Sequence, residues 1–158
     1  MNVDKRNQIL SIVLAVVIVG LGYYLYRSIN DPYQEVLEQE QMTEQVRHRM
    51  SLVRDALREY EQSVGNFPPT EGGLDTLVQW VMTDSLISRQ ADSLFAFMPP
   101  SSYSPDSLII SPRPPHNRFE YTLNDTLRPQ IYLLEDPDSE DNIGDLTNTT
   151  ELNAASWE

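Results

Sequence analysis

The sequence contains no cysteine and only one lysine, and basic residues are few overall. Without cysteine the chain can form neither a disulfide framework nor a zinc finger, and it has no thiol chemistry. Its 11 Lys and Arg face 24 Asp and Glu, so the formal net charge is −13. A surface of that sign repels nucleic-acid phosphates and suits divalent cations or basic partners. We therefore expect no nucleic-acid partner.

The arrangements that common enzyme classes require are also missing. No glycine-rich phosphate loop occurs, and no nucleophile stands in a recognisable pattern with a base. The two histidines stand apart: His48 lies between arginines in a helical pattern and is interpreted as a surface residue, and His116 lies in a proline-rich connector. We expect a protein that is not an enzyme and that takes no small-molecule substrate.

What the sequence does have is one long apolar run near its start, Ile9–Tyr26, with 18 residues and no charge. At ~1.5 Å per residue a helix of this length spans ~27 Å, close to the thickness of a hydrocarbon core. Three tyrosines and then Arg27 end the run, as is typical of a membrane interface. The alternative is a cleaved signal peptide, but the run is long for one and no small-residue cleavage site follows it. The sequence predicts a transmembrane helix over 9–27.

Residues 1–8 form a short polar N-terminus that carries Lys5 and Arg6. Positive charge favours the cytoplasmic side of a membrane, so we expect residues 1–8 to be cytoplasmic. Arg27 on the other flank weakens this bias. The acidic bulk of the chain is then expected on the outer side.

A second helix, the stalk, is predicted over 30–64, with Asp31 as its cap and Pro32 as its first residue. Residues 34–45 are polar and are either solvated or a contact surface for neighbouring subunits, and the sequence leaves both open. Beyond them, apolar residues recur in steps of four and three, which places them on one helical face. These residues are Val46, Met50, Val53, Leu57, Tyr60 and Val64. Gly65 is suited to end the helix.

The remaining chain predicts a small α+β head over 65–146 and a polar tail over 147–158. Thr70 is expected to cap a short helix whose apolar face repeats at i, i+3, i+4 and i+7. Residues 118–123 and 129–134 are the best strands, and the former alternates polar and apolar residues. The predicted fold class is therefore α+β, with a transmembrane helix continuing into a stalk helix that packs on a small antiparallel sheet.

An acidic loop over 135–145 follows the second strand and holds six acids with no base between them. Such a group of charges must be spread into solvent or neutralised. Asp136, Asp138, Asp141 and Asn142, with main-chain carbonyls, offer the oxygen ligands that calcium prefers. The pattern is not that of an EF-hand. A solvated loop and a calcium site both remain open on composition.

The stretch between the helices carries a resemblance to a known family. Residues 56–60 read ALREY, residues 65–74 read GNFPPTEGGL, and Leu77-Val78 follow. The order and spacing of this string resemble the signature of the major pseudopilin of bacterial type II secretion systems, which are type IV pilin-like proteins. The resemblance covers roughly residues 5–146 in layout. The sequence similarity is strongest over residues 56–78 and 131–144.

The resemblance implies both a site and a location. Pseudopilins of this kind hold a structural calcium ion in the corresponding loop, so the implied ligands are the Leu134 carbonyl and side chains of the loop. The implied side chains are Asp136, Asp138, Asp141 and Asn142. The implied location is the bacterial inner membrane, crossed once, with a periplasmic head. The implied partners are like subunits or other pseudopilins, contacted through the helix.

The N-terminus departs from the family pattern. Members carry a glycine at the prepilin cleavage position and a glutamate five residues later, where this chain has Ile9 and Leu14. The sequence therefore indicates a divergent relative that lacks the cleavage motif. The alternatives are a single-pass membrane scaffold or coiled-coil protein of divisome type, outside any filament, and a periplasmic module that binds a basic or cationic ligand.

Overall fold

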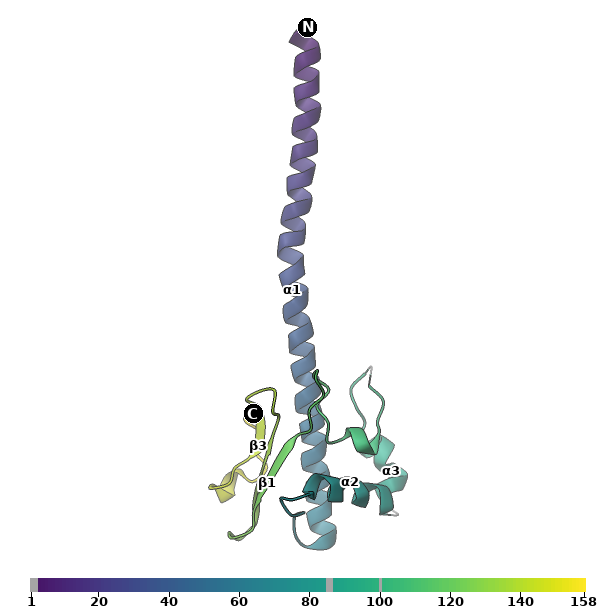
Figure 1. Cartoon of the computed structure of the whole chain (residues 1–158), viewed down its shortest axis with the longest axis vertical. Helices are drawn as coiled ribbons and strands as arrows, with labels where there is room; N and C mark the ends of the chain where they lie inside the picture. Colours follow the sequence, from purple (N-terminus) through teal and green to yellow (C-terminus); the bar gives the residue numbers. More distant parts are fainter. Residues whose placement is uncertain (1–2, 85–86, 100) are drawn as a thin grey trace. The chain divides into compact units, whose positions relative to one another are not determined.

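The computed structural model describes residues 3–84, 87–99 and 101–158 (Figure 1). The chain forms two compact units, which we name the N-terminal unit (Met1–Gln41) and the C-terminal unit (Met42–Glu158). One helix, α1 (Val3–Val64), runs through both. The helix start expected at Asp31 is therefore absent: residues 28–32 are helical, and Pro32 lies inside α1.

In the N-terminal unit, the apolar part of α1 has no packing partner within the unit. Every described side chain over residues 6–29 is exposed. This is the one helix among the described residues that is long and apolar enough to cross a membrane. The predicted apolar helix is thus present, and its large apolar side chains, Ile12 and Val16 among them, are left to an external environment.

In the C-terminal unit, α1 supplies the buried spine of the core. Four residues of the predicted apolar face are fully buried, and Tyr60 is 9% exposed. The four are Val46, Met50, Val53 and Leu57. Val64 was predicted to continue this face but is 48% exposed, because the helix ends there. Gly65 takes φ 90°, a conformation open to glycine, and turns the chain away as predicted.

Helix α2 (Gly73–Thr83) buries its predicted face of Leu74, Leu77, Val78 and Val81. The expected cap at Thr70 is wrong, since Gly72 occupies the N-cap position. Thr70 instead accepts a hydrogen bond at Oγ1 from the Leu123 amide, 3.0 Å away. A short helix, α3 (Ile87–Leu94), follows α2.

The sheet has three antiparallel strands in the order β1 (Glu120–Asn124), β2 (Ile131–Glu135) and β3 (Asn142–Gly144). The two predicted strands are confirmed with small shifts at their ends. Strand β3 lies inside the segment expected to be an acidic loop. Outside these strands, Ile110 and Arg118 form an isolated antiparallel bridge.

The predicted polar tail, 147–158, contains a short 3-10 helix, η2 (Thr149–Glu151), and then packs along β3. The Gly144 amide donates to the Ala154 carbonyl at 2.8 Å, and the Ser156 amide donates to the Asn142 carbonyl at 2.9 Å. Ala155 is buried between these contacts. The end of the chain therefore extends the sheet rather than hanging free.

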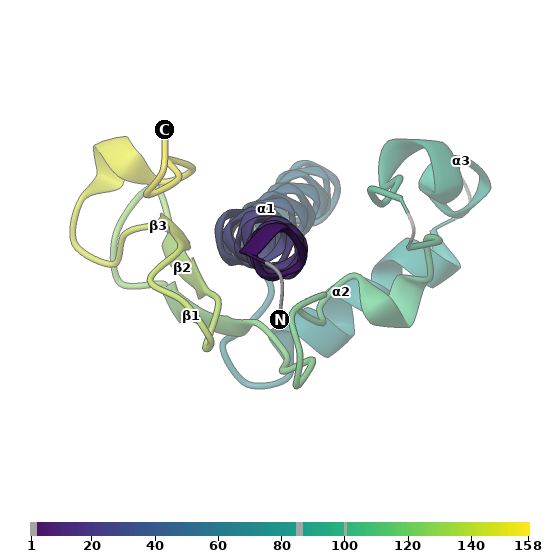
Figure 2. The same cartoon turned by 90° about the horizontal axis from the view of Figure 1, so that it is seen from above.

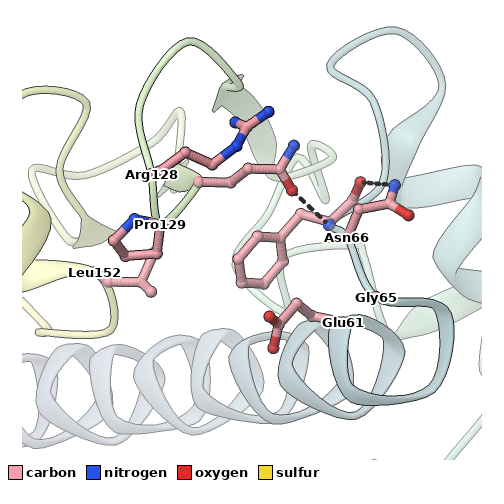
Figure 3. Close-up of a pocket in the computed structure, with 8 residues that line it drawn as sticks. Glu61, Gly65, Asn66, Arg128, Pro129 and Leu152 are labelled. Carbon is pink, nitrogen blue, oxygen red and sulfur yellow. Dashed lines mark hydrogen bonds between the residues drawn. The ribbon is translucent and has the colours of Figure 1, made fainter.

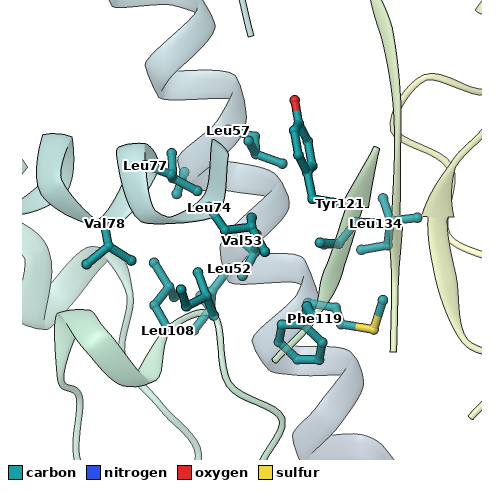
Figure 4. Packing of buried hydrophobic residues seen from close by; sticks show 14 of the residues in the cluster. Leu52, Val53, Leu57, Leu74, Leu77, Val78, Leu108, Phe119, Tyr121 and Leu134 are labelled. Atoms are coloured by element: carbon teal, nitrogen blue, oxygen red, sulfur yellow. The ribbon is translucent and has the colours of Figure 1, made fainter. Parts of the chain in front are cut away.

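The core of the C-terminal unit lies between these layers. Figure 2 shows the strands on one side of α1 in this unit and helices α2 and α3 on the other. Figure 4 shows Val53 and Leu57 of α1 meeting Leu74 of α2 and Tyr121 of β1. A second tyrosine, Tyr132, is fully buried in β2 with its ring 6.0 Å from that of Tyr121.

We expect alkaline pH to destabilise the C-terminal unit through these two tyrosines. Tyr121 donates to the Pro68 carbonyl and Tyr132 to Asn153 Oδ1, each at 2.9 Å. Burial raises the pKa of both hydroxyls well above the usual value near 10. The stability they contribute is therefore complete below pH ~10 and is lost as pH rises through the folded-state values.

A phenolate absorbance titration checks this expectation against the variants Tyr121→Phe and Tyr132→Phe. Tyr121 and Tyr132 should ionise together with loss of tertiary structure. Ionisation of Tyr121 or Tyr132 near pH 10 with the fold intact would contradict the assignment. Each Phe variant should remove one late-titrating group.

Candidate functional site

The loop between β2 and β3 is the candidate site, because the predicted ligands gather there. The strand pair ends at Glu135 and Asn142, which face each other in register. Between them the chain makes a tight turn, in which the Asp136 amide donates to the Asp141 carbonyl at 3.1 Å. The Ser139 amide donates to the Asp136 carbonyl at 3.2 Å. The acidic loop is thus a compact, internally bonded turn.

Asp141 is held by an arginine from α1. Arg47 donates from Nε to Oδ2 at 3.0 Å and from Nη2 to Oδ1 at 2.8 Å. The Asp141 side chain is 11% exposed, whereas that of Arg47 is 39% exposed. The hydrogen bonds that Arg47 donates to Asp141 raise the pKa of the guanidinium. The guanidinium also lies 5.2 Å from the ring of Trp157, so it bridges the loop and the end of the chain.

Asp138 is held by residues of the proline-rich connector. Its two carboxylate oxygens accept hydrogen bonds from Asn117 Nδ2 at 3.0 and 3.1 Å. Its carbonyl accepts from Arg113 Nη1 at 3.0 Å, while Arg113 Nη2 donates to Thr43 Oγ1 at 3.3 Å. The connector and α1 therefore both supply hydrogen-bond donors to the acidic loop, which contains no basic residue of its own.

Asp136 is the most buried of the predicted side-chain ligands, at 2% exposure. Its Oδ2 accepts from Ser139 Oγ at 2.7 Å. Its Oδ1 is buried, and no group among the described residues hydrogen-bonds to it. One carboxylate oxygen of the site is consequently left for a further donor.

Leu134 and Asn142 have roles in the sheet. Leu134 is fully buried in the central strand and faces Tyr121 on one side and Ile143 on the other. Asn142 donates its amide to Ser156 Oγ at 3.0 Å and its side chain to the Glu140 carbonyl at 3.3 Å. Leu134 and Asn142 therefore help to hold together the strands that flank the turn.

The residues present do not form a calcium shell in this arrangement. The described residues contain no group of three Asp, Glu, His or Cys side chains placed to share one ion. Calcium takes six to eight oxygens, and the carboxylates of Asp138 and Asp141 already hold Asn117 and Arg47. An ion would have to displace both partners. Calcium binding at Leu134, Asp136, Asp138, Asp141 and Asn142 stays a prediction.

Sequence reasoning missed the arginines that serve this loop. Arg47 sits beside the apolar residue Val46 and is 94 positions from Asp141, so no local pattern links them. The signal that was available is the charge balance: six acids without a base need a counter-charge, and arginine supplies nearly every base in the chain.

His48 and Arg49, which follow Arg47 in α1, contact other segments of the chain. His48, interpreted from sequence as a surface residue, donates from Nε2 to the Ala96 carbonyl at 2.8 Å. Arg49 is 7% exposed, lies 3.9 Å from the Phe97 ring and donates to the Ile110 carbonyl at 3.0 Å. Desolvation lowers the pKa of Arg49. Residues 47–49 therefore connect α1 to three distant parts of the chain.

Replacing Arg49 by methionine should destabilise the C-terminal unit by about 2–4 kcal/mol. The partly buried Ile110 carbonyl would lose its charged donor, and Phe97 would lose the stacked guanidinium. Chemical denaturation of the detergent-solubilised chain measures the effect, with the exposed Arg89 replaced by methionine as control. Equal stability of the two variants would contradict the role given to Arg49.

Away from the loop, a cavity of about 280 Å³ lies beside the end of α1. Figure 3 shows Glu61 on one side and Arg128 on the other, with Pro129 between the arginine and Leu152. Arg128 donates to the Asp125 and Leu127 carbonyls, at 2.6 and 2.8 Å. None of the predicted ligands lines this cavity, so it does not extend the candidate site.

Comparison of the chain with protein-family models, with curated proteins and with solved structures gives no match. The interpretation of function therefore rests on the residues and contacts described above.

Proposed function

We propose that the chain is a non-enzymatic structural subunit of pseudopilin type, anchored in a membrane by α1. It would belong to a type II secretion or pilus-type machine of the bacterial inner membrane, with its N-terminus cytoplasmic and its C-terminal unit periplasmic. The observation that carries the proposal is α1 itself. This one helix is uncharged and exposed over Ile9–Tyr26 and supplies the buried face of a folded unit from Val46 onward.

The pattern of exposure along α1 supports assembly through this helix. Side chains over 33–41 are almost all exposed, Tyr33 at 60% and Val36 at 51%. The described part of the N-terminal unit, residues 3–41, consists of α1 alone, so it holds no second element to cover this helix. Lipid would cover the apolar run, and neighbouring helices of like subunits or other pseudopilins would cover part of the rest.

The proposal does not include a calcium ion. In the acidic loop, the carboxylate of Asp141 is bonded to Arg47 and that of Asp138 to Asn117, so the proposed mechanical role does not require the metal. The loop residues have a structural role: β3 pairs with β2 on one side, and backbone hydrogen bonds from residues 154–156 cover its other side.

Co-purification of two differently tagged copies tests the proposal. When both are expressed together and extracted in mild detergent, one tag should recover the other copy. Replacing Tyr33 and Val36 by aspartate should reduce this recovery, whereas aspartate at Met82, an exposed apolar residue outside α1, should not. Recovery of a single copy only, from membranes that hold both, would count against assembly of like subunits.

A second candidate is a single-pass membrane scaffold of divisome type. The observation in its favour is the N-terminus, where Ile9 and Leu14 replace the family's cleavage glycine and guiding glutamate. A scaffold of this kind would form dimers and no larger series. The size of the species that co-purify therefore distinguishes the two candidates.

A further inference from the structure

The acidic loop must balance its negative charge, and the contacts identify the groups that do so. Asp141 is the loop carboxylate with a cation on both oxygens, at 3.0 and 2.8 Å from Arg47. This is a bidentate pair, the geometry in which arginine binds a carboxylate most strongly. With Asp141 only 11% exposed, the pair is screened by water less than an ordinary surface pair.

We propose that Arg47 is the resident counter-cation of the acidic loop, so that a guanidinium from α1 holds the loop closed where the resemblance implies a calcium ion. Calcium would join strand β2 to the loop through shared oxygens. Arg47 joins the loop to α1 instead, which is the spine of the core. The loop is thus fastened directly to the helix.

The remaining loop oxygens are consistent with this assignment. The carboxylate of Asp138 accepts both contacts from Asn117, and its carbonyl accepts from Arg113. Asp136 Oδ1 is the one buried side-chain oxygen of the loop without a hydrogen bond among the described residues. Calcium takes six to eight oxygens, so this one free side-chain oxygen does not make a shell. A divalent ion would also be repelled by the charge of Arg47 close by.

The same helix face fastens the end of the chain. The ring of Trp157 packs on the Arg47 guanidinium at 5.2 Å, and Ser156 bonds the loop residue Asn142 through both its amide and its hydroxyl. Two turns further along α1, Arg54 lies 3.5 Å from a Glu158 carboxylate oxygen. Arg47 therefore couples closure of the loop to docking of residues 156–158.

Thermal unfolding of the full chain in detergent, with calcium and with a chelator, tests the proposal. The melting temperature of the unmodified chain should be the same in millimolar calcium and in excess chelator. Arg47→Met should lower the melting temperature by roughly 5 °C. Arg58→Met, an exposed arginine on the same helix, is the matched control and should change it little. A fall in the melting temperature of the unmodified chain on chelation would overturn the proposal, as would equal effects of the two variants.

A double-mutant cycle shows whether Arg47 acts through Asp141. The variant that combines Arg47→Met with Asp141→Asn should melt no lower than the more damaging single variant, because the two changes remove one interaction. Additive losses would overturn the pairing. If Arg47→Met fails to fold, hydrogen exchange of the unmodified chain decides: equal protection of 135–145 with and without chelator supports the proposal, and faster exchange with chelator overturns it.

This inference does not depend on the proposed assembly. A chain that never associates with its copies would still keep a calcium-independent loop. Conversely, a chelator-sensitive loop would leave the co-purification result unchanged.

Discussion

Replacing Gly144 by alanine should unfold the edge of the sheet and cost more than about 4 kcal/mol of stability. Gly144 has φ 88°, a backbone conformation that residues other than glycine rarely adopt. An added Cβ would lie 2.2 Å from the Tyr132 carbonyl oxygen and 3.0 Å from that of Leu152. Both are backbone atoms that cannot move without separating β2 or the end of the chain from β3.

Gly65 provides the matched control for this change. Its φ of 90° is equally unusual, but nothing lies within 4 Å of an added Cβ. Gly65→Ala should therefore cost only the backbone strain, about 1–2 kcal/mol. Circular dichroism of both variants during heating measures the difference. Similar melting temperatures would contradict the close packing of β2, β3 and the chain end around Gly144.

Placing three arginines in the apolar run should release the chain from the membrane. Leu14→Arg, Val17→Arg and Ile18→Arg together would oppose insertion by roughly 8–10 kcal/mol, because each arginine near the helix centre costs several kcal/mol. The C-terminal unit does not use these side chains, which are 48–60% exposed. It should stay folded while the protein moves from the membrane pellet to the soluble fraction.

Three arginines outside the run, which add more positive charge than the three inside it, control for the effect of charge. Arginine at Glu35, Glu38 and Gln41, all exposed positions of α1, should leave the protein in the membrane fraction after alkaline washing. If the triple variant in the apolar run also withstood alkaline washing, the run would not be the anchor.

The sequence was sufficient where a residue's role depends on its close neighbours. The spacing of Val46, Met50 and Leu57 gave the buried face of α1, because helical periodicity is a local property. Alternation over 118–123 gave β1 in the same way. At Thr70 the local rule failed, since its hydroxyl bonds to Leu123 across the chain and Gly72 takes the N-cap position.

The candidate site depended on contacts that no local pattern reveals. The acidic loop was visible as composition, but strand β3 inside it has only three residues and alternates weakly. The partner of Asp141 lies 94 positions away on α1. The packing of 152–158 on β3 was likewise hidden, because the segment is polar and its contacts are mostly made by the backbone. The six acids of the loop indicated that a positive counter-charge must lie nearby, but not which residue supplies it.

The N-terminus bears on the proposed assembly. In that proposal, a subunit with Ile9 and Leu14 in place of the cleavage glycine and the guiding glutamate would be packed with residues 1–8 still attached. Packing would then be guided by other surfaces of α1, of which 33–41 is the exposed polar stretch closest to the apolar run.

Cross-linking in native membranes tests the central claim, assembly through α1, most directly. Since the chain has no cysteine, Val36→Cys and Glu38→Cys together provide the sole thiols, at exposed positions on opposite sides of α1. A thiol-reactive cross-linker should give a ladder of dimers, trimers and larger species, whereas each single cysteine should stop at dimers. A doubly substituted chain that yields only monomer, or dimer and nothing larger, would contradict the claim.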